Sequence, residues 1–131
     1  EQTQIKCIVQ SPVIHTAAIG FSDGEILIAN LYYDEVLLKF QQTEGSIQAL
    51  SFSTDSSMEL SILASISNDA QGGSNIVLWD LNKQRIYSVI QMAHGGRQIT
   101  DLHFMPNEPI LITASDDDNS IKMWHFEKGV T

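Results

Sequence analysis

The chain has little of what marks secreted or membrane-spanning proteins. Its 131 residues include one cysteine, Cys7, so the cysteine content offers no internal disulfide and no sign of the secretory pathway. No apolar run approaches the roughly 18 residues that a membrane-spanning helix needs. The sequence therefore predicts a protein that contacts no membrane and contains no disulfide.

Basic residues are scarce as well, with 7 Lys and Arg against 16 Asp and Glu and a net charge of −9. Nucleic-acid-binding surfaces gain affinity from clustered Lys and Arg, which displace the counterions of phosphate groups. The basic residues here are scattered: Lys6, Lys39, Lys83, Arg85, Arg97, Lys122 and Lys128. The charge balance argues against direct, sequence-independent RNA binding. It favours a solvated acidic surface and leaves a basic protein partner open.

A repeat is the most informative feature that the sequence does contain. Residues 76–81 (IVLWDL) and 121–126 (IKMWHF) each follow a polar loop, and each loop follows an apolar run, at 62–67 (ILASIS) and 110–115 (ILITAS). The two copies lie 45 residues apart (121 − 76), as expected for one four-stranded blade of a β-propeller. A weaker third copy lies upstream at 16–30 (TAAIGFSDGEILIAN).

The fold predicted from this repeat is all-β, because short runs bounded by Gly, Pro, Asn and Asp recur and no window shows a helical apolar period. Residues 76–79 are apolar at successive positions, so both faces of that strand must be covered by neighbouring sheets. The expected strands lie at 16–21, 25–30, 36–40, 47–52, 62–67, 76–81, 86–90, 99–104, 110–115 and 121–126. We therefore expect one domain over residues 1–131, a partial propeller of about three four-stranded blades, with units near 5–40, 41–91 and 92–131.

The motifs of these units resemble those of WD40 propellers. Trp79 and Asp80 form the dipeptide for which WD40 repeats are named. His94, next to a glycine, lies where such repeats carry a Gly-His pair before their first strand. The third unit, with this His, a strand Ser, a turn Asp and Trp124, resembles a nearly complete WD40 repeat.

That resemblance implies a buried, hydrogen-bonded tetrad of His94, Ser115, Asp118 and Trp124. A buried indole N–H must find an acceptor. Ser115, or alternatively Thr113, would accept from Trp124 and donate to the imidazole, while Asp118 would orient the other imidazole nitrogen. Because the acidic loop is longer than usual, the choice among its three Asp residues stays open.

The other two units depart from the pattern. The second keeps Trp79 and Asp80 but has Thr-Glu-Gly at 43–45 where the His is expected, so it would hold a partial tetrad at most. The first has Ala and Asn at 29–30 in place of Trp-Asp. Degenerate blades are ordinary in WD40 proteins, so these departures bear on the individual sites more than on the fold.

The same residue types invite two further interpretations, a catalytic triad or a metal site. The Ser, His and Asp recur with the blade around a buried Trp, and no Gly-x-Ser-x-Gly motif is present. The acidic run 116–118 lacks the spacing and the closing Glu of a calcium loop. His15, His103 and His125 have no metal-ligand spacing with Cys7. We therefore predict a non-enzymatic protein with no catalytic residue, metal or cofactor.

A closer resemblance spans nearly the whole chain. Segments 99–113 (ITDLHFMPNEPILIT) and 118–126 (DNSIKMWHF) resemble the family of tandem-propeller WD-repeat proteins of the small-subunit processome, the nucleolar assembly around the U3 small nucleolar RNA. Residues 10–12 (QSP), 18–24 (AIGFSDG) and 76–81 fit it in the same order. The resemblance implies a nucleolar scaffold that supports pre-18S rRNA processing by contacting other processome proteins. The net charge of −9 predicts that contact with RNA is indirect.

A second class of function stays open, a generic WD40 adaptor that reads a peptide in signalling or as a ubiquitin-ligase substrate receptor. The fold alone does not separate the two classes.

In either case propellers close with about 4–8 blades, whereas this chain supplies fewer than three complete ones. Open blade edges and faces tend to pair with other chains. We therefore expect the isolated chain to be marginally stable or to self-associate.

Overall fold

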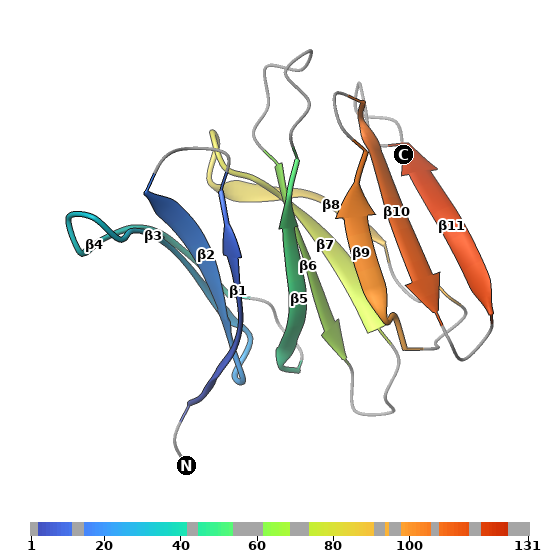
Figure 1. Cartoon of the computed structure of the whole chain (residues 1–131), viewed down its shortest axis with the longest axis horizontal. Coiled ribbons are helices and arrows are strands. Elements are labelled where there is room, and N and C mark those ends of the chain that lie inside the picture. The colour runs from blue at the N-terminus through green and yellow to red at the C-terminus, as the bar shows by residue number, and fades with distance from the viewer. Residues whose placement is uncertain are drawn as a thin grey trace.

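The computed structural model describes residues 3–11, 15–41, 45–53, 62–68, 74–90, 94, 98–105, 108–115 and 119–125. Within these residues it contains eleven β-strands and no helix (Figure 1). The strands are β1 (Ile5–Gln10), β2 (Thr16–Phe21), β3 (Glu25–Asn30), β4 (Glu35–Gln41), β5 (Ile47–Phe52), β6 (Ile62–Asn68), β7 (Ser74–Asp80), β8 (Arg85–Ile90), β9 (Asp101–Phe104), β10 (Ile110–Ser115) and β11 (Ser120–His125). The predicted all-β fold is confirmed, and the ends of the predicted strands differ from these by two residues at most. The strand β1 was not predicted.

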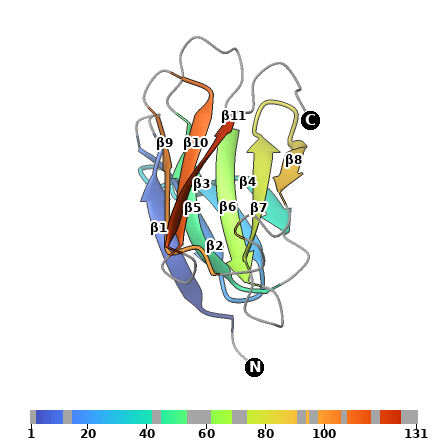
Figure 2. The same cartoon turned by 90° about the vertical axis from the view of Figure 1, so that its right-hand side faces the viewer.

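The strands form three antiparallel sheets that follow the order of the chain. The sheets are β1-β2-β3-β4, β5-β6-β7-β8 and β9-β10-β11. Figure 1 shows them side by side, and Figure 2 shows that the first strands β1, β5 and β9 lie on one side of the molecule, with β4 and β8 on the other. This is the arrangement of successive propeller blades, as predicted. The fourth strand expected for the third blade falls after residue 125, outside the described residues.

The second blade is buried on both faces by its two neighbours. Successive side chains of a strand point to opposite faces. Val77 and Trp79 pack in the cluster shared with the first blade, whereas Ile76 and Leu78 pack in the cluster shared with the third. All four are buried, which confirms the prediction made from four successive apolar positions. Burying one such side chain contributes roughly 1.5–3 kcal/mol, so stacking supplies much of the stability of these sheets.

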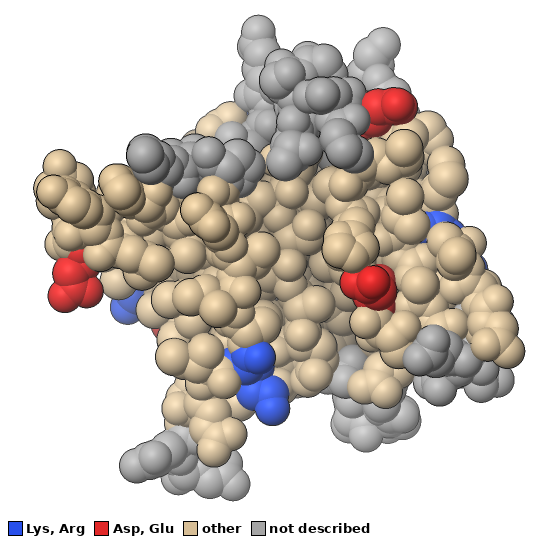
Figure 3. Space-filling view, viewed as in Figure 1, with Lys and Arg blue, Asp and Glu red and all other residues tan. Residues whose placement is uncertain are grey.

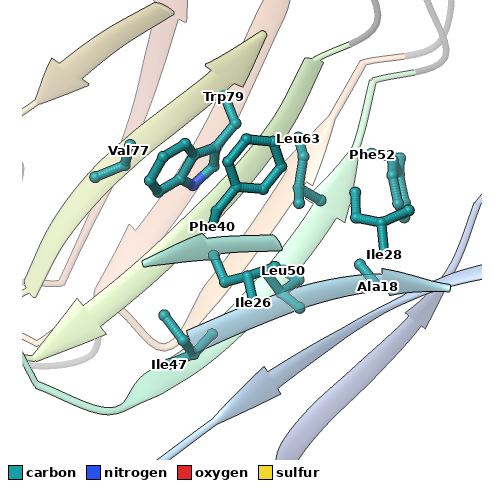
Figure 4. Packing of buried hydrophobic residues seen from close by; sticks show 10 residues of the cluster. All are labelled: Ala18, Ile26, Ile28, Phe40, Ile47, Leu50, Phe52, Leu63, Val77 and Trp79. Carbon is teal, nitrogen blue, oxygen red and sulfur yellow. The ribbon is translucent and has the colours of Figure 1, made fainter. Parts of the chain in front are cut away.

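An aromatic contact lies at the centre of the interface between the first and second blades. Phe40, near the end of β4, has its ring centroid 4.7 Å from that of Trp79, with the ring planes at 34°. Figure 4 shows the two rings side by side among the aliphatic side chains of this cluster. Such a pair contributes about 0.5–1.5 kcal/mol beyond the area that it buries. Outer strand β4 is thereby joined to the neighbouring blade.

A glycine allows the first two blades to approach closely. Gly20 lies in β2 opposite Cys7 of β1. A Cβ atom added at Gly20 would lie 2.5 Å from Ile47 Cγ2, 2.8 Å from Ile47 Cβ and 2.9 Å from Cys7 Sγ. Ile47 is the first residue of β5 and is fully buried. Any side chain at Gly20 therefore forces β2 and β5 apart.

We expect Gly20→Ala to lower the free energy of unfolding by about 1–3 kcal/mol, because overpacking a buried contact displaces backbone. Equilibrium unfolding in urea would measure the change. Gly20→Ala should cost less in an Ile47→Ala background than in the parent but should still destabilise, because Cγ2 of Ile47 is removed whereas its Cβ remains 2.8 Å from the added atom. A Gly20→Ala protein as stable as its parent would contradict the close packing of the two blades.

Candidate functional site

A buried histidine joins the strands of the third blade. His94 lies between β8 and β9 and is almost fully buried. Its Nε2 atom is 2.7 Å from Oγ1 of Thr113 in β10. Trp124 in β11 donates its indole N–H to the same oxygen at 3.0 Å. On the other side of the imidazole, Nδ1 is 2.9 Å from Oγ of Ser120. One hydroxyl therefore links the imidazole to the indole.

Two placements of the protons satisfy all three contacts. The Thr113 hydroxyl accepts from the Trp124 indole, so its own hydrogen is available for Nε2 of His94. In this tautomer Nδ1 carries the ring proton and donates a hydrogen bond to the Ser120 hydroxyl. In the other tautomer Nε2 donates to Thr113 and Ser120 donates to Nδ1, and the same contacts are satisfied. A buried donor or acceptor left without a partner costs about 1–3 kcal/mol. The arrangement removes that cost for each of these groups and ties β10 to β11.

The structure gives a different hydroxyl from the one that we preferred. Ser115 donates to the backbone carbonyl of Gln98 at 2.7 Å and does not lie between the imidazole and the indole. The register explains the difference, because Trp124 is paired with Leu111. Thr113 is then the diagonal neighbour of the tryptophan, and Ser115 is two residues farther along the same face. The alternative in our prediction, Thr113, is the residue in contact.

The third partner in the prediction, Asp118, lies outside the described residues. Beside Nδ1 of His94 the structure places Ser120, the first residue of β11, which the sequence analysis did not consider. Little in the sequence indicates this role for Ser120, because serine is common in turns and beside acidic loops.

The second blade contains the same hydrogen bond from tryptophan to a hydroxyl, without a histidine among the described residues. The Trp79 indole donates to Oγ of Ser65 at 2.9 Å, in a buried position. Trp79 is paired with Leu63, and Ser65 is its diagonal neighbour, as Thr113 is for Trp124. We missed Ser65, although the runs 62–67 (ILASIS) and 110–115 (ILITAS) align residue by residue. Residues 43–44, where a histidine equivalent would fall, lie outside the described residues.

Asp80, which we grouped with Trp79, has a separate role. It is buried, and its Oδ1 accepts from the backbone N–H groups of Asn82 and Lys83 at 3.0 and 3.1 Å. A carboxylate that bonds main-chain N–H groups two and three residues ahead fixes a turn. Asp80 therefore caps the turn from β7 to β8 and makes no contact with the indole that the structure shows.

Two further reactive groups among the described residues are the Cys7 thiol and the His103 imidazole. Burial raises the pKa of the Cys7 thiol, although a backbone hydrogen bond with Gly20 acts in the opposite direction. The neutral thiol packs as a small apolar group against the first interface. His103 contacts Asp101 at 3.0 Å, but both are exposed, so the pair contributes little.

In the part of the chain that the structure describes, no group of three or more His, Cys, Asp or Glu is placed to hold a metal ion. Nor do the described residues include a helix that is both long and apolar enough to cross a membrane.

The blade architecture and the repeated Trp-to-hydroxyl contact can be compared with known proteins. The model of one family, the WDR36/Utp21 first beta-propeller, matches residues 1–127. The chain belongs to this family. That membership agrees with the resemblance carried by the 99–113 and 118–126 segments.

Named relatives of this WDR36/Utp21 propeller come from yeasts and human. U3 small nucleolar RNA-associated protein 21 homolog of Schizosaccharomyces pombe is 38% identical over 123 residues, 94% of this chain. WD repeat-containing protein 36 of Homo sapiens is 32% identical over 125 residues, also 94% of the chain. U3 small nucleolar RNA-associated protein 21 of Saccharomyces cerevisiae is 27% identical over 132 residues, 98% of the chain. The chain spans 12% to 13% of the length of these relatives.

Among solved structures, a chain in the crystal structure of the mitotic checkpoint complex resembles this one with a TM-score of 0.76. The match covers 98% of this chain and 36% of that chain at 16% sequence identity. At such low identity the likeness shows a shared fold alone.

Proposed function

We propose that the chain is part of a non-catalytic scaffold of the small-subunit processome, which supports pre-18S rRNA processing in the nucleolus through contacts with other proteins. The observation that carries the proposal is the family match over residues 1–127, together with relatives named for the U3 small nucleolar RNA. The buried site agrees with a scaffold. His94, Thr113 and Trp124 bond to one another, so their polar groups hold a blade together instead of facing a substrate.

The charge distribution favours protein contacts over direct RNA contacts. The net charge is −9, and Figure 3 shows a face on which basic and acidic side chains are few and scattered. Affinity for phosphate backbones depends on clustered positive charge. We therefore propose that RNA in the particle is reached through neighbouring proteins.

The two outer faces of the stack support a place within a longer propeller. Ile121 and Met123 of β11 are 75% and 57% exposed, on the face turned away from the second blade. At the other end Ile8 of β1 is 60% exposed, on the face opposite the first interface. Propellers close with about 4–8 blades. We infer that further blades of a longer protein cover both faces, and that the isolated chain would self-associate through them.

Purification of the intact protein that carries these residues tests the proposal. We expect the tagged protein to bring down U3 small nucleolar RNA and processome proteins, and its depletion to cause unprocessed pre-18S rRNA to accumulate. Ribonuclease treatment should leave the protein partners bound, because the contacts are between proteins. Leu78→Asp, which places a charge in the buried interface of the second and third blades, should abolish the recovery. Lys83→Gln, in an exposed turn, should leave it unchanged.

Recovery of a ubiquitin-ligase adaptor or of histone tails, with no enrichment of U3 small nucleolar RNA, would contradict the scaffold proposal. It would support the adaptor function instead.

A further inference from the structure

Three aromatic side chains gather on the outside of the first blade. Tyr32 and Tyr33, in the turn between β3 and β4, are 69% and 71% exposed. Their ring centroids are 4.9 Å apart and the ring planes meet at 88°. His15, just before β2, stacks on Tyr32 at 4.9 Å and 23°. We call these three residues the aromatic corner. Apolar groups that cluster on an exposed surface are a common feature of interaction sites.

Main-chain contacts hold the aromatic corner in place. The N–H of Leu31 donates to the His15 carbonyl at 2.7 Å, which joins the turn to the segment before β2. Oδ1 of Asn30 accepts from the N–H of Tyr33 at 3.0 Å. His15 itself has a φ of 65°, a left-handed conformation that is uncommon for residues other than glycine. The rings are therefore preorganised, and preorganisation lowers the entropic cost of binding a partner.

The turn does not need tyrosines for its own geometry. In the second blade Asp80 caps the turn from β7 to β8 as Asn30 caps this one. Each turn follows a register shift in its pair of strands and contains one residue with positive φ, at 55° and 57°. This shared backbone carries Tyr-Tyr-Asp-Glu at 32–35 but Asn-Lys-Gln-Arg at 82–85. The geometry of the turn therefore does not require the tyrosines.

Two carboxylates adjoin the aromatic corner. Asp34 and Glu35 are exposed and follow the two tyrosines directly. The other two acidic residues of 15–41, Asp23 and Glu25, lie by the far end of β3, where Glu25 pairs with Gln41. Figure 3 shows acidic atoms at the left end of the molecule, where Figure 1 places the hairpin of β3 and β4, with basic atoms close beside them. Such a surface complements a cation. An arginine guanidinium both stacks on an aromatic ring and pairs with a carboxylate through two hydrogen bonds.

We propose that the aromatic corner, with Asp34 and Glu35, is a docking site for an arginine-containing segment of a partner protein. The guanidinium lies on a tyrosine ring and pairs with a neighbouring carboxylate. RNA bases also stack on exposed rings, but here the carboxylates and the net charge of −9 repel phosphates. The site lies on an outer turn, away from the buried His94, and does not depend on which particle the protein joins.

Fluorescence anisotropy tests this site in the intact protein that carries these residues. The probe is a labelled peptide of alternating arginine and glycine. The double variant Tyr32→Asn, Tyr33→Gln keeps the net charge and the polar turn chemistry of the second blade. It should bind about tenfold more weakly or worse, with an unchanged unfolding midpoint. Tyr32→Phe with Tyr33→Phe keeps both rings and should bind within about twofold of the parent.

Matched variants separate local pairing from overall charge. Glu35→Gln should weaken binding several-fold, whereas Glu25→Gln, at the start of the neighbouring strand, should change it little. A peptide with lysine in place of arginine should bind more weakly, since an ammonium does not stack as a plane. The proposal is overturned if the parent does not bind the arginine peptide, or if Tyr32→Asn, Tyr33→Gln binds it equally well. Tighter binding of an oligouridylate than of the peptide would assign the corner to RNA instead.

Discussion

Replacing Trp79 by alanine is expected to lower the free energy of unfolding by about 3–5 kcal/mol, the largest effect of any single substitution that we predict. The indole fills the interface between the first two blades, 4.7 Å from the Phe40 ring, and donates to Oγ of Ser65. Its loss opens a cavity and leaves the Phe40 ring without its neighbour. Domains have only about 5–15 kcal/mol of net stability, so this substitution would remove much of the free energy of unfolding. Equilibrium unfolding in guanidinium chloride measures the change.

Two further variants show which part of the indole matters. Trp79→Phe keeps a six-membered ring near Phe40 but removes the N–H donor and part of the ring volume, so the loss should be smaller than for Trp79→Ala, about 1–3 kcal/mol. Trp124→Ala should cost less than Trp79→Ala, because Trp124 is half-buried at the end of the stack. Equal midpoints for the parent and Trp79→Ala would contradict the central place that the structure gives this side chain.

The sequence predicted the strands and their stacking well because both depend on local patterns. Short runs bounded by turn residues place the predicted strands to within two residues. Four successive apolar positions, from Ile76 to Trp79, require a sheet on each side, and the structure provides both. The sequence analysis did not predict strand β1, in which Cys7 and Val9 pack at the first interface while Ile8 is largely exposed.

The partners in the buried site depend on register, which a pattern does not specify. Thr113 and Ser115 are two hydroxyls on the same face of β10, and a shift of two residues in the pairing of β11 would exchange them. The length of the intervening loop sets that pairing. A comparison with the second blade identifies the correct hydroxyl. Ser65 takes the same diagonal position beside Trp79 as Thr113 takes beside Trp124.

The aromatic corner was beyond prediction for a different reason. His15 and Tyr32 are 17 residues apart (32 − 15), and their stacking arises from the contact of two turns. The sequence analysis treated His15 only as a metal ligand to be excluded. Comparing the turns at 32–35 and 82–85 is informative only once the shared backbone is known.

The second large effect is expected at His94. His94→Ala removes the imidazole that contacts Thr113 Oγ1 at 2.7 Å and Ser120 Oγ at 2.9 Å. Two hydroxyls then lose a partner in a buried site, so the free energy of unfolding should fall by roughly 1–3 kcal/mol. Thermal unfolding of the parent and the variant checks this, and an unchanged melting temperature would contradict the hydrogen-bonded role of the imidazole.

Substitutions at Thr113 make the His94 prediction specific to the network. Thr113→Val keeps the shape of the side chain but removes the oxygen shared by His94 and Trp124, so it should destabilise by a similar amount. Thr113→Ser keeps the oxygen and should cost less. Because the imidazole and the hydroxyl act through one contact, the effects of His94→Ala and Thr113→Val should not add in the double variant. Additive losses would mean that the two side chains stabilise the blade independently, and the link from imidazole to indole would then carry no energy of its own.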